Sequence, residues 1–483
     1  MGDTEVTTAQ GGSTGKVSRP VLTAMVIGSM VGAGVFGLPA RFGTATGVAG
    51  ALIAWTVAGT GMLMLAFCFQ TLAIRKPELN SGVFIYAKAG FGDYAGFNSA
   101  VGFWASTMAG NAFYWIFITA TIGFFFPEFG EGDTLLAVAV STIGVWVFHY
   151  LIARGVRDAA VINRIVTICK VIPILTFIVV LGFQFDAGVF SDNFFAYDDL
   201  GTLTEQVKNT MIITTFVFIG IEGASVYSRY AQRREDVGRA TVLGFLSVLA
   251  IFSLVTMVSY GAFSQAEIVG TPQPSMIGLF EQAVGPWGKW FISIGVIVSV
   301  LGAYLAWTLM AAEVVFIPAR SDDMPRFLGR ENAAGTPIAA LVATSIGVQV
   351  LLALTLFIED SLDFMLDLTT SLALVPYLLA AAYALKLALS GETYEAEDSA
   401  ERRKHLVFAA VASAYAIFLF IAAGLEFLLL SCLVYAPAAV LFVVARRERR
   451  LRVFTPAELA LFVVIAIGAV VALYQLLTGG ITV

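Results

Sequence analysis

The sequence is poor in the residue types that carry enzymatic and metal chemistry. Among its 483 residues are only two histidines and three cysteines, and Cys68, Cys169 and Cys432 lie far apart along the chain. Neither a metal-ligand spacing nor a nucleophile–base motif is present, and isolated cysteines within apolar runs are usually small buried side chains. We therefore expect no enzyme, no metal and no cofactor.

Charge is scarce as well. Only 13% of the residues are charged, whereas 58% are hydrophobic, and a soluble domain carries about 25% charged residues. Apolar runs of about 20 residues, the length of a helix that crosses a bilayer, recur from Val21 to Val483. A polar tail of about 16 residues precedes them and is typical of a disordered segment rather than a cleaved signal peptide. The composition predicts an all-α polytopic membrane protein.

We place about thirteen spans on these runs. The pair near 407–425 and 427–446 is the least well separated, because little but Glu426 lies between its members. The spans are expected near 21–42, 48–74, 96–126, 134–153, 160–184, 209–228, 241–263, 287–317, 338–358, 363–388, 407–425, 427–446 and 457–478.

The basic residues test this assignment independently. With the N-terminus in the cytoplasm, all but four of the 28 Lys and Arg residues fall in cytoplasmic segments. Arg41, Lys208 and Lys289 fall on the outer side, and Lys170 lies within a span. This is the positive-inside distribution, so we expect a multi-pass protein of a bacterial or archaeal cytoplasmic membrane. Its basic inner loops should contact anionic lipid headgroups, and nothing indicates nucleic acid.

Two of the predicted spans contain glycine where a helix should be continuous. The first holds "GSMVGAGVFG", Gly28 to Gly37, and the sixth holds "FVFIGIEGAS", Phe216 to Ser225. Interrupted helices at corresponding positions of oppositely oriented halves indicate an inverted-repeat transporter. The alternative is close helix packing, for which Gly28 and Gly32 have the required spacing of four.

An unwound helix suggests a particular ligand. Unpaired backbone groups are tolerated within a membrane only where they face a cavity or a ligand. A half-helix that starts near Gly32 to Gly34 would offer N–H groups to a carboxylate. A break near Ile219 and Gly220 would offer carbonyl oxygens to an ammonium group. Together they would recognise an α-amino acid.

Several motifs resemble one known family. "GSMVGAGVFGLPA" is similar to the first-helix signature of the amino acid–polyamine–organocation superfamily. "TFVFIGIEGASVYSRYAQRREDVGRATVLGF" resembles the sixth helix and following loop of its basic amino acid/polyamine antiporter branch, most closely that of arginine/ornithine antiporters. "GAYLAWTLMAAEV", "GTPIAALV" and "LVPYLL" match as well, so the resemblance extends over nearly all of residues 20 to 480.

The resemblance implies a transporter fold of two inverted five-helix repeats with broken first and sixth helices, followed by accessory C-terminal helices. We expect a disordered tail at 1–18, the first repeat at 19–184, the second at 185–390, and a cytoplasmic loop with accessory helices at 391–483. The resemblance implies twelve spans for arginine/agmatine exchangers. The thirteenth span expected here is similar to an extra span in antiporters of the ornithine type.

Substrate-binding residues follow from the resemblance, position by position. The family's amine-binding turn matches the region of Phe216, Ile219 and Gly220, with Phe216 as an aromatic gate. Related exchangers have a serine in place of Ala33, so backbone donors would have to suffice there. The carboxylate-binding turn matches Gly32, Ala33 and Gly34.

The resemblance also assigns the surroundings of the substrate side chain. Asn111 matches a position that hydrogen-bonds that side chain, and Trp307 matches an aromatic residue that packs on it. Phe103 and Trp104 match an outer aromatic gate, and Tyr377 matches a gate residue of the tenth helix. Without the resemblance, Asn111 fits a helix–helix hydrogen bond equally well and Trp307 fits a core aromatic.

Three ionisable residues fall at membrane depth, where charged groups are usually functional. Glu222 follows Ile219 closely and would offset a cationic substrate or cap the broken helix. Lys170 would hold the first and fifth helices together or titrate during transport, since a lysine there replaces sodium in proton-coupled relatives. Glu313 would pair with Lys170 or sense protons, and a static buried ion pair between them is the alternative.

The sequence therefore predicts an antiporter of basic amino acids, arginine for ornithine, that works by alternating access, with a homodimer left open. The rival within transporters is proton-driven uptake of lysine or arginine. A channel fits less well because the spans are too apolar for a polar pore, and a receptor would need a soluble output domain.

Overall fold

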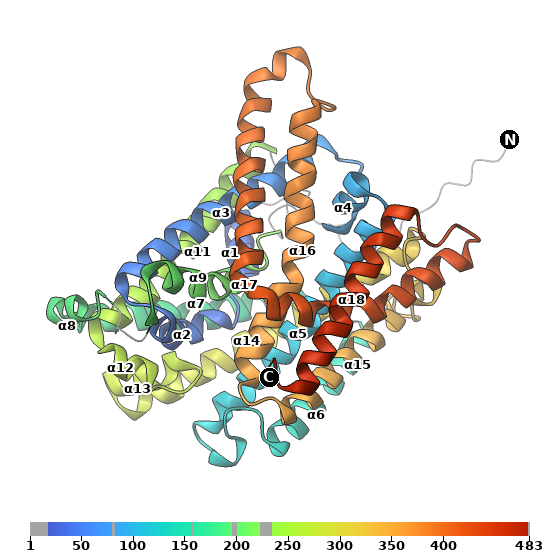
Figure 1. Cartoon of the computed structure of the whole chain (residues 1–483). Helices are drawn as coiled ribbons and strands as arrows, with labels where there is room; N and C mark the ends of the chain where they lie inside the picture. Colours follow the sequence, from blue (N-terminus) through green and yellow to red (C-terminus); the bar gives the residue numbers. More distant parts are fainter. Residues whose placement is uncertain (1–17, 80–82, 156–158, 196–199, 223–233, 482–483) are drawn as a thin grey trace.

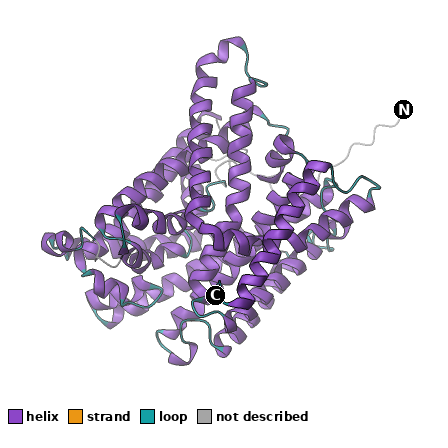
Figure 2. Ribbon diagram, in the orientation of Figure 1, coloured by secondary structure: helices purple, strands orange, loops and turns teal. Residues whose placement is uncertain are grey.

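The computed structural model describes residues 18–79, 83–155, 159–195, 200–222 and 234–481. Within them the chain consists of helices and connecting loops, with no strand (Figures 1 and 2). The helices are α1 (Arg19–Met30), η1 (Gly34–Gly37), α2 (Leu38–Ala45), α3 (Val48–Arg75), α4 (Val83–Phe91), α5 (Asp93–Gly123), α6 (Leu135–Ala153), α7 (Ala159–Phe183), α8 (Ala187–Asp192), α9 (Leu203–Phe218), α11 (Arg234–Ala262), α12 (Gln265–Val269), α13 (Ser275–Val284), α14 (Pro286–Arg320), α15 (Ile338–Leu354), α16 (Ser361–Ser390), α17 (Ser399–Glu448) and α18 (Pro456–Thr478).

In the described part of the chain, eight helices are long and apolar enough to cross a membrane, or nine if the bent pair at residues 22–45 counts as one span. The protein is thus an all-helical polytopic membrane protein. Helix α5 is not among these eight although it has 31 residues, because it carries buried polar residues such as Asn98, Ser106 and Asn111. It packs against α4, α14, α15 and α16, so little of it needs a lipid-compatible surface.

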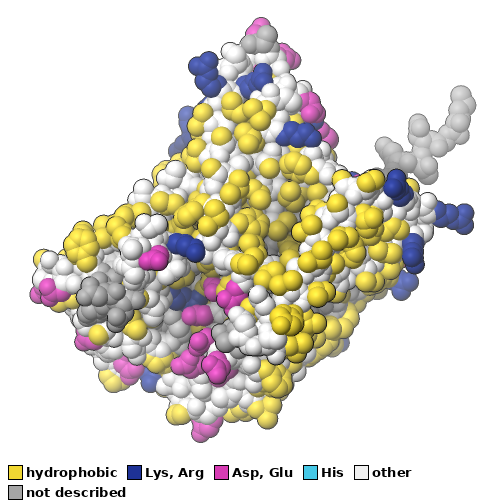
Figure 3. Space-filling view, viewed as in Figure 1, with side chains coloured by type: hydrophobic (Ala, Val, Ile, Leu, Met, Phe, Trp, Pro, Cys, Tyr) yellow, Lys and Arg dark blue, Asp and Glu magenta, His cyan; other side chains and the backbone are white. Residues whose placement is uncertain are grey.

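The outer surface fits a lipid environment. On α18, Val464, Ile467 and Val470 are exposed by 58–68%, and α17 exposes Leu425 and Val440. Figure 3 shows broad apolar areas over the helices on this face, while many Lys and Arg side chains lie toward its margins. Such contiguous apolar surface is unfavourable in water and is suited to acyl chains.

The two least separated predicted spans form the single long helix α17 of 50 residues. At a rise of 1.5 Å per residue it would measure about 75 Å if straight, against about 30 Å of hydrocarbon. Gly424 breaks it with φ 78° and ψ 167°, two residues from Glu426, where the sequence predicts the boundary. The prediction of about thirteen spans is finer than the eight or nine shown, and the predicted tail at 1–18 lies almost wholly outside the described residues.

Both predicted helix breaks are present. Helix α1 ends at Met30, and Val31 is extended with φ −75° and ψ 98°. Helical structure resumes at Gly34, and the segment Gly34–Ala45 is bent by 49° from Leu22–Met30. Helix α9 ends at Phe218, followed by Ile219 at ψ 131° and Gly220 at φ 110°. The continuation of the second break, at 223–233, lies outside the described residues.

The two breaks touch each other through glycine. A Cβ atom on Gly34 would lie 2.8 Å from Cγ1 of Val217, and one on Gly220 would lie 2.4 Å from the carbonyl oxygen of Ser29. Both distances are shorter than any tolerable contact, so each glycine allows one broken segment to lie directly on the other. This close approach explains the glycines better than the helix-packing alternative alone does.

Gly220→Ala should destabilise the protein by about 2 kcal/mol or more, because it combines an unfavourable positive φ with a clash against backbone. Thermal unfolding of the detergent-solubilised protein measures this. Gly182→Ala is the matched control: Gly182 lies in α7 with nothing within 4 Å of the added Cβ, and the variant should be as stable as the parent or slightly more so. Equal melting temperatures for the two variants would contradict the argument.

Candidate functional site

A cavity lies at the point where the two breaks meet. It encloses about 420 Å³ of empty space, counting the part open to solvent. Six elements contribute to it: the α1–η1 break, α5, the end of α9, α11, α14 and α16. Its lining comprises Ser29, Met30, Gly32, Ala33, Gly34, Val35, Gly110, Tyr114, Phe216, Val217, Ile219, Phe252, Trp307 and Thr369.

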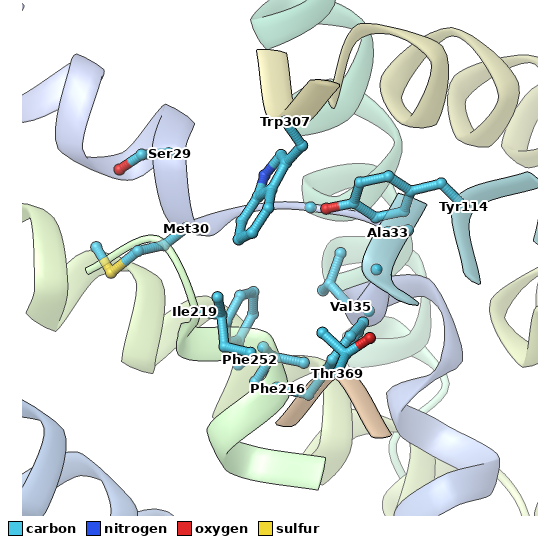
Figure 4. A pocket seen from close by; sticks show the side chains of 14 residues that line it. Ser29, Met30, Ala33, Val35, Tyr114, Phe216, Ile219, Phe252, Trp307 and Thr369 are labelled. Atoms are coloured by element: carbon cyan, nitrogen blue, oxygen red, sulfur yellow. The ribbon is translucent and has the colours of Figure 1, made fainter. Parts of the chain in front are cut away.

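Four aromatic side chains line the cavity: Tyr114, Phe216, Phe252 and Trp307. Figure 4 shows the Trp307 indole reaching into the cavity from α14 and the Tyr114 hydroxyl pointing toward the stretch at Ala33. Phe216 and Ile219 lie on the opposite wall, below Trp307 in this view. The Phe216 ring packs against Phe113 with centroids 4.8 Å apart in an edge-to-face arrangement. Such rings exclude water and provide flat surfaces for an aliphatic chain or a guanidinium group.

The cavity lining includes the backbone N–H groups of the first break. Within the described residues, the N–H groups of Gly32, Ala33 and Gly34 donate to no protein acceptor. The short helix η1 begins at this point and runs directly into α2, so its positive end faces the same space. Unpaired donors at a helix start form a natural anion site.

Lys170 satisfies the other side of the first break. Its Nζ donates to the carbonyl oxygens of Gly28 at 2.7 Å and Val31 at 2.9 Å, the last carbonyls of α1 and the first beyond it. Lys170 is buried on α7, so the predicted link between the first and fifth spans is confirmed. The predicted pairing with Glu313 is wrong: Glu313 is exposed on α14 and forms no ion pair within the described residues. The lysine charge is taken up by free carbonyls instead.

Glu222 and Tyr377 meet on one side of the cavity. The Tyr377 hydroxyl donates to Oε2 of Glu222 at 2.8 Å, and the N–H of Gly220 donates to the same oxygen at 3.2 Å. Both side chains are buried and neither lines the cavity. Glu222 therefore caps the broken helix, one of its two predicted roles, and also fastens it to α16.

The remaining predicted residues lie around the cavity rather than in its wall. Asn111 is fully buried and donates through Nδ2 to Oγ1 of Thr308 at 3.3 Å. Trp104 donates to Oγ1 of Thr344 on α15 at 2.9 Å, and Phe103 is buried on the same helix α5. Of the predicted substrate residues, the cavity brings together Gly32, Ala33, Gly34, Phe216, Ile219 and Trp307.

Tyr114 and Thr369 were not singled out by sequence reasoning, although both line the cavity. Tyr114 lies three residues after Asn111, close to the same face of α5, and this spacing was the available signal. Thr369 lies in the middle of α16 among other small residues, where nothing local distinguishes it.

Long apolar helices around a cavity formed by two broken helices define a membrane transporter for a small solute. A family model described as amino acid permease matches residues 18–468, and the chain belongs to this family. It is a transporter family, which confirms that the protein is not an enzyme.

Curated relatives are similar over nearly the whole chain. An arginine/ornithine antiporter of Pseudomonas aeruginosa is 46% identical over 97% of this chain and 99% of its own length. An L-lysine transport protein of Corynebacterium glutamicum is 37% identical over 96% of each chain. An arginine/ornithine antiporter of Latilactobacillus sakei is 36% identical over 97% of this chain and 98% of its own.

Lys170→Met should lower the stability of the protein by about 2 kcal/mol, because two buried carbonyl groups lose a charged donor. The measurement is thermal unfolding in detergent. Lys289→Met is the control, since Lys289 is partly exposed and its Nζ lies as far as 3.8 Å from Oε2 of Glu281. Because exposed ion pairs are weak, this variant should change stability by about 0.5 kcal/mol or less. An unaffected Lys170→Met variant would show that the first break does not depend on this lysine.

Proposed function

We propose that the protein is an antiporter that exchanges arginine for ornithine across a bacterial cytoplasmic membrane by alternating access. The observation that carries this proposal is the cavity between two broken helices, where N–H groups on one side have no acceptor among the described residues. The similarity to arginine/ornithine antiporters over almost the full chain supports the substrate pair.

In this proposal the substrate carboxylate binds the free N–H groups of Gly32, Ala33 and Gly34. Its ammonium group binds carbonyl oxygens at the end of α9, near Ile219 and Gly220. These contacts use only the groups that arginine and ornithine share, so either amino acid fits the same place. The cationic side chain extends along Trp307, and Asn111 contacts it after giving up its bond to Thr308.

The gates follow from the positions around the cavity. Phe216 closes the substrate from one side, and the bond between Glu222 and Tyr377 closes the other. Phe103 and Trp104 are proposed gate residues at the Glu222 end of the cavity, since the neighbouring Gly102 lies against the carbonyl oxygen of Leu372 on α16. We place these parts in two inverted five-helix repeats, at 19–184 and 185–390, with a cytoplasmic N-terminus and accessory helices at 391–483. Glu313 remains a proposed proton-sensing residue and Lys170 a proposed coupling residue, and the homodimer remains a prediction.

Counterflow in proteoliposomes tests the proposal. Vesicles loaded with ornithine should take up labelled arginine rapidly, whereas empty vesicles should take up little, and the exchange should carry no net charge at pH 7. The relative named as an L-lysine transport protein suggests the rival to include: lysine uptake driven by a pH gradient. Uptake that ignores internal ornithine and follows the pH gradient would favour that rival.

Gly34→Ala should reduce exchange by about tenfold or more, because the added methyl group would press on Val217 and Phe216, 2.8 and 3.0 Å away. Gly110→Ala is a matched control in the same cavity, since its methyl group would meet Thr369 at an ordinary 3.4 Å. Initial rates of counterflow compare the two. Similar losses in both variants would mean that the two breaks need not touch during transport.

A further inference from the structure

Helix α16 passes the cavity and carries a different group on each side of it. Thr369 lines the cavity, and Tyr377, eight residues further, binds Glu222. Six residues before Thr369, Asp363 contacts Arg41. At 1.5 Å per residue these contacts lie about 12 Å and about 9 Å from Thr369 along the helix axis, in opposite directions. The ion pair therefore stands at the end of the cavity away from Glu222.

Arg41 is held in an unusual position for a cation. Its side chain is only 5% exposed, although it belongs to α2, which continues from the first broken helix. Its Nη2 lies 2.5 Å from Oδ1 of Asp363, and its Cζ lies 5.4 Å from the centre of the Phe113 ring. Its Nε has no hydrogen-bond partner among the described residues. Burial of an incompletely bonded guanidinium is unfavourable, so the arrangement calls for an explanation.

The partner of Arg41 is, by contrast, open to water. The Asp363 side chain is 62% exposed. Asp367 follows it by four residues and so lies on the same face of α16, one turn nearer the cavity. Among the described residues, the charged groups near Asp367 are Asp363, Arg41 and Glu426. In Figure 3, acidic side chains gather around the hollow in the middle of this face.

Arg41 is also linked directly to the substrate cavity. Phe113, against which its guanidinium lies, packs on Phe216 with ring centroids 4.8 Å apart. Phe216 lines the cavity. A single aromatic ring thus separates the guanidinium of Arg41 from the cavity wall at Phe216.

We propose that Asp363 and Asp367 form a peripheral binding station for the cationic side chain of a basic amino acid, and that Arg41 occupies this station when no substrate is present. The proposal rests on the proposed function for its substrate class. An arriving guanidinium or ammonium group takes over the carboxylates, Arg41 is released, and the path past Phe113 and Phe216 opens. A neutral amino acid offers no replacement charge and leaves the station closed.

The station therefore both selects cationic amino acids over neutral ones and closes the path to the cavity in the absence of substrate. Replacing one cation by another at the same carboxylates conserves the charge balance, whereas opening the pair without a substitute leaves the buried guanidinium of Arg41 without its counter-charge. An empty carrier is therefore kept closed at this end, which favours exchange over leak.

The closure is tested without any substrate. Thr369→Cys, in a chain whose three native cysteines are replaced by serine, places a thiol in the cavity wall. A membrane-impermeant maleimide added from the face at which α16 begins should label it about tenfold faster when Arg41→Gln is also present. Arg41→Lys should label nearly as slowly as the parent. Equal labelling rates for Thr369→Cys with and without Arg41→Gln would show that Arg41 does not close the path to the cavity.

The station is tested by sided kinetics in oriented proteoliposomes. Asp363→Asn and Asp367→Asn should each raise the KM for arginine about tenfold from the face at which α16 begins and leave the KM from the opposite face unchanged. A merely structural role would lower the maximal rate from both faces alike. Glu359→Gln, which removes an exposed negative charge just before α16, is the matched control and should leave both KM values unchanged.

The two hypotheses fail in different ways. If the parent protein shows no arginine–ornithine counterflow, the proposed function is wrong, while the labelling result still decides the closure. If the parent exchanges both amino acids and the Asp363 and Asp367 variants keep the parent KM on both faces, the function stands and the peripheral station is wrong.

Discussion

The structure depends on how unpaired backbone groups are satisfied where two helices break inside the membrane. In hydrocarbon, free N–H and C=O groups are strongly unfavourable. At the first break Lys170 neutralises the carbonyl side by binding Gly28 and Val31. The N–H groups on the other side remain without a protein acceptor in the described residues, and we propose that the substrate carboxylate binds there. The proposed position of the substrate carboxylate follows from that asymmetry.

The second break is stabilised differently. Glu222 accepts from the N–H of Gly220 and from the hydroxyl of Tyr377, so a carboxylate both caps the broken segment and ties it to α16. The same helix bears Asp363, the partner of Arg41. One continuous helix is thus in contact with both broken segments through Tyr377 and Asp363.

The sequence predicted the features that depend on local chemistry. Glycine at 32, 34 and 220 located both breaks, because only flexible backbone can leave a helix there. Lys170 was identified because an ammonium group at membrane depth must find partners. Its partners were only half predicted: the link to the first span was right, but Glu313 was not the counter-charge. The position of an ionisable residue within an apolar run does not show whether its side chain faces the protein interior. The structure shows that the Glu313 side chain is exposed.

By itself, the sequence determined that this is an all-helical membrane protein of the amino acid permease family with two interrupted spans, because apolar length and backbone flexibility are properties of short segments. Only the tertiary structure decided which groups surround the cavity. It placed Tyr114 and Thr369 in the wall, held Asn111 on Thr308, and set Arg41 against Asp363, more than 300 residues away in the chain. These contacts arise where separate helices cross, and the side chain that meets a neighbour depends on helix rotation and packing, which no local pattern encodes.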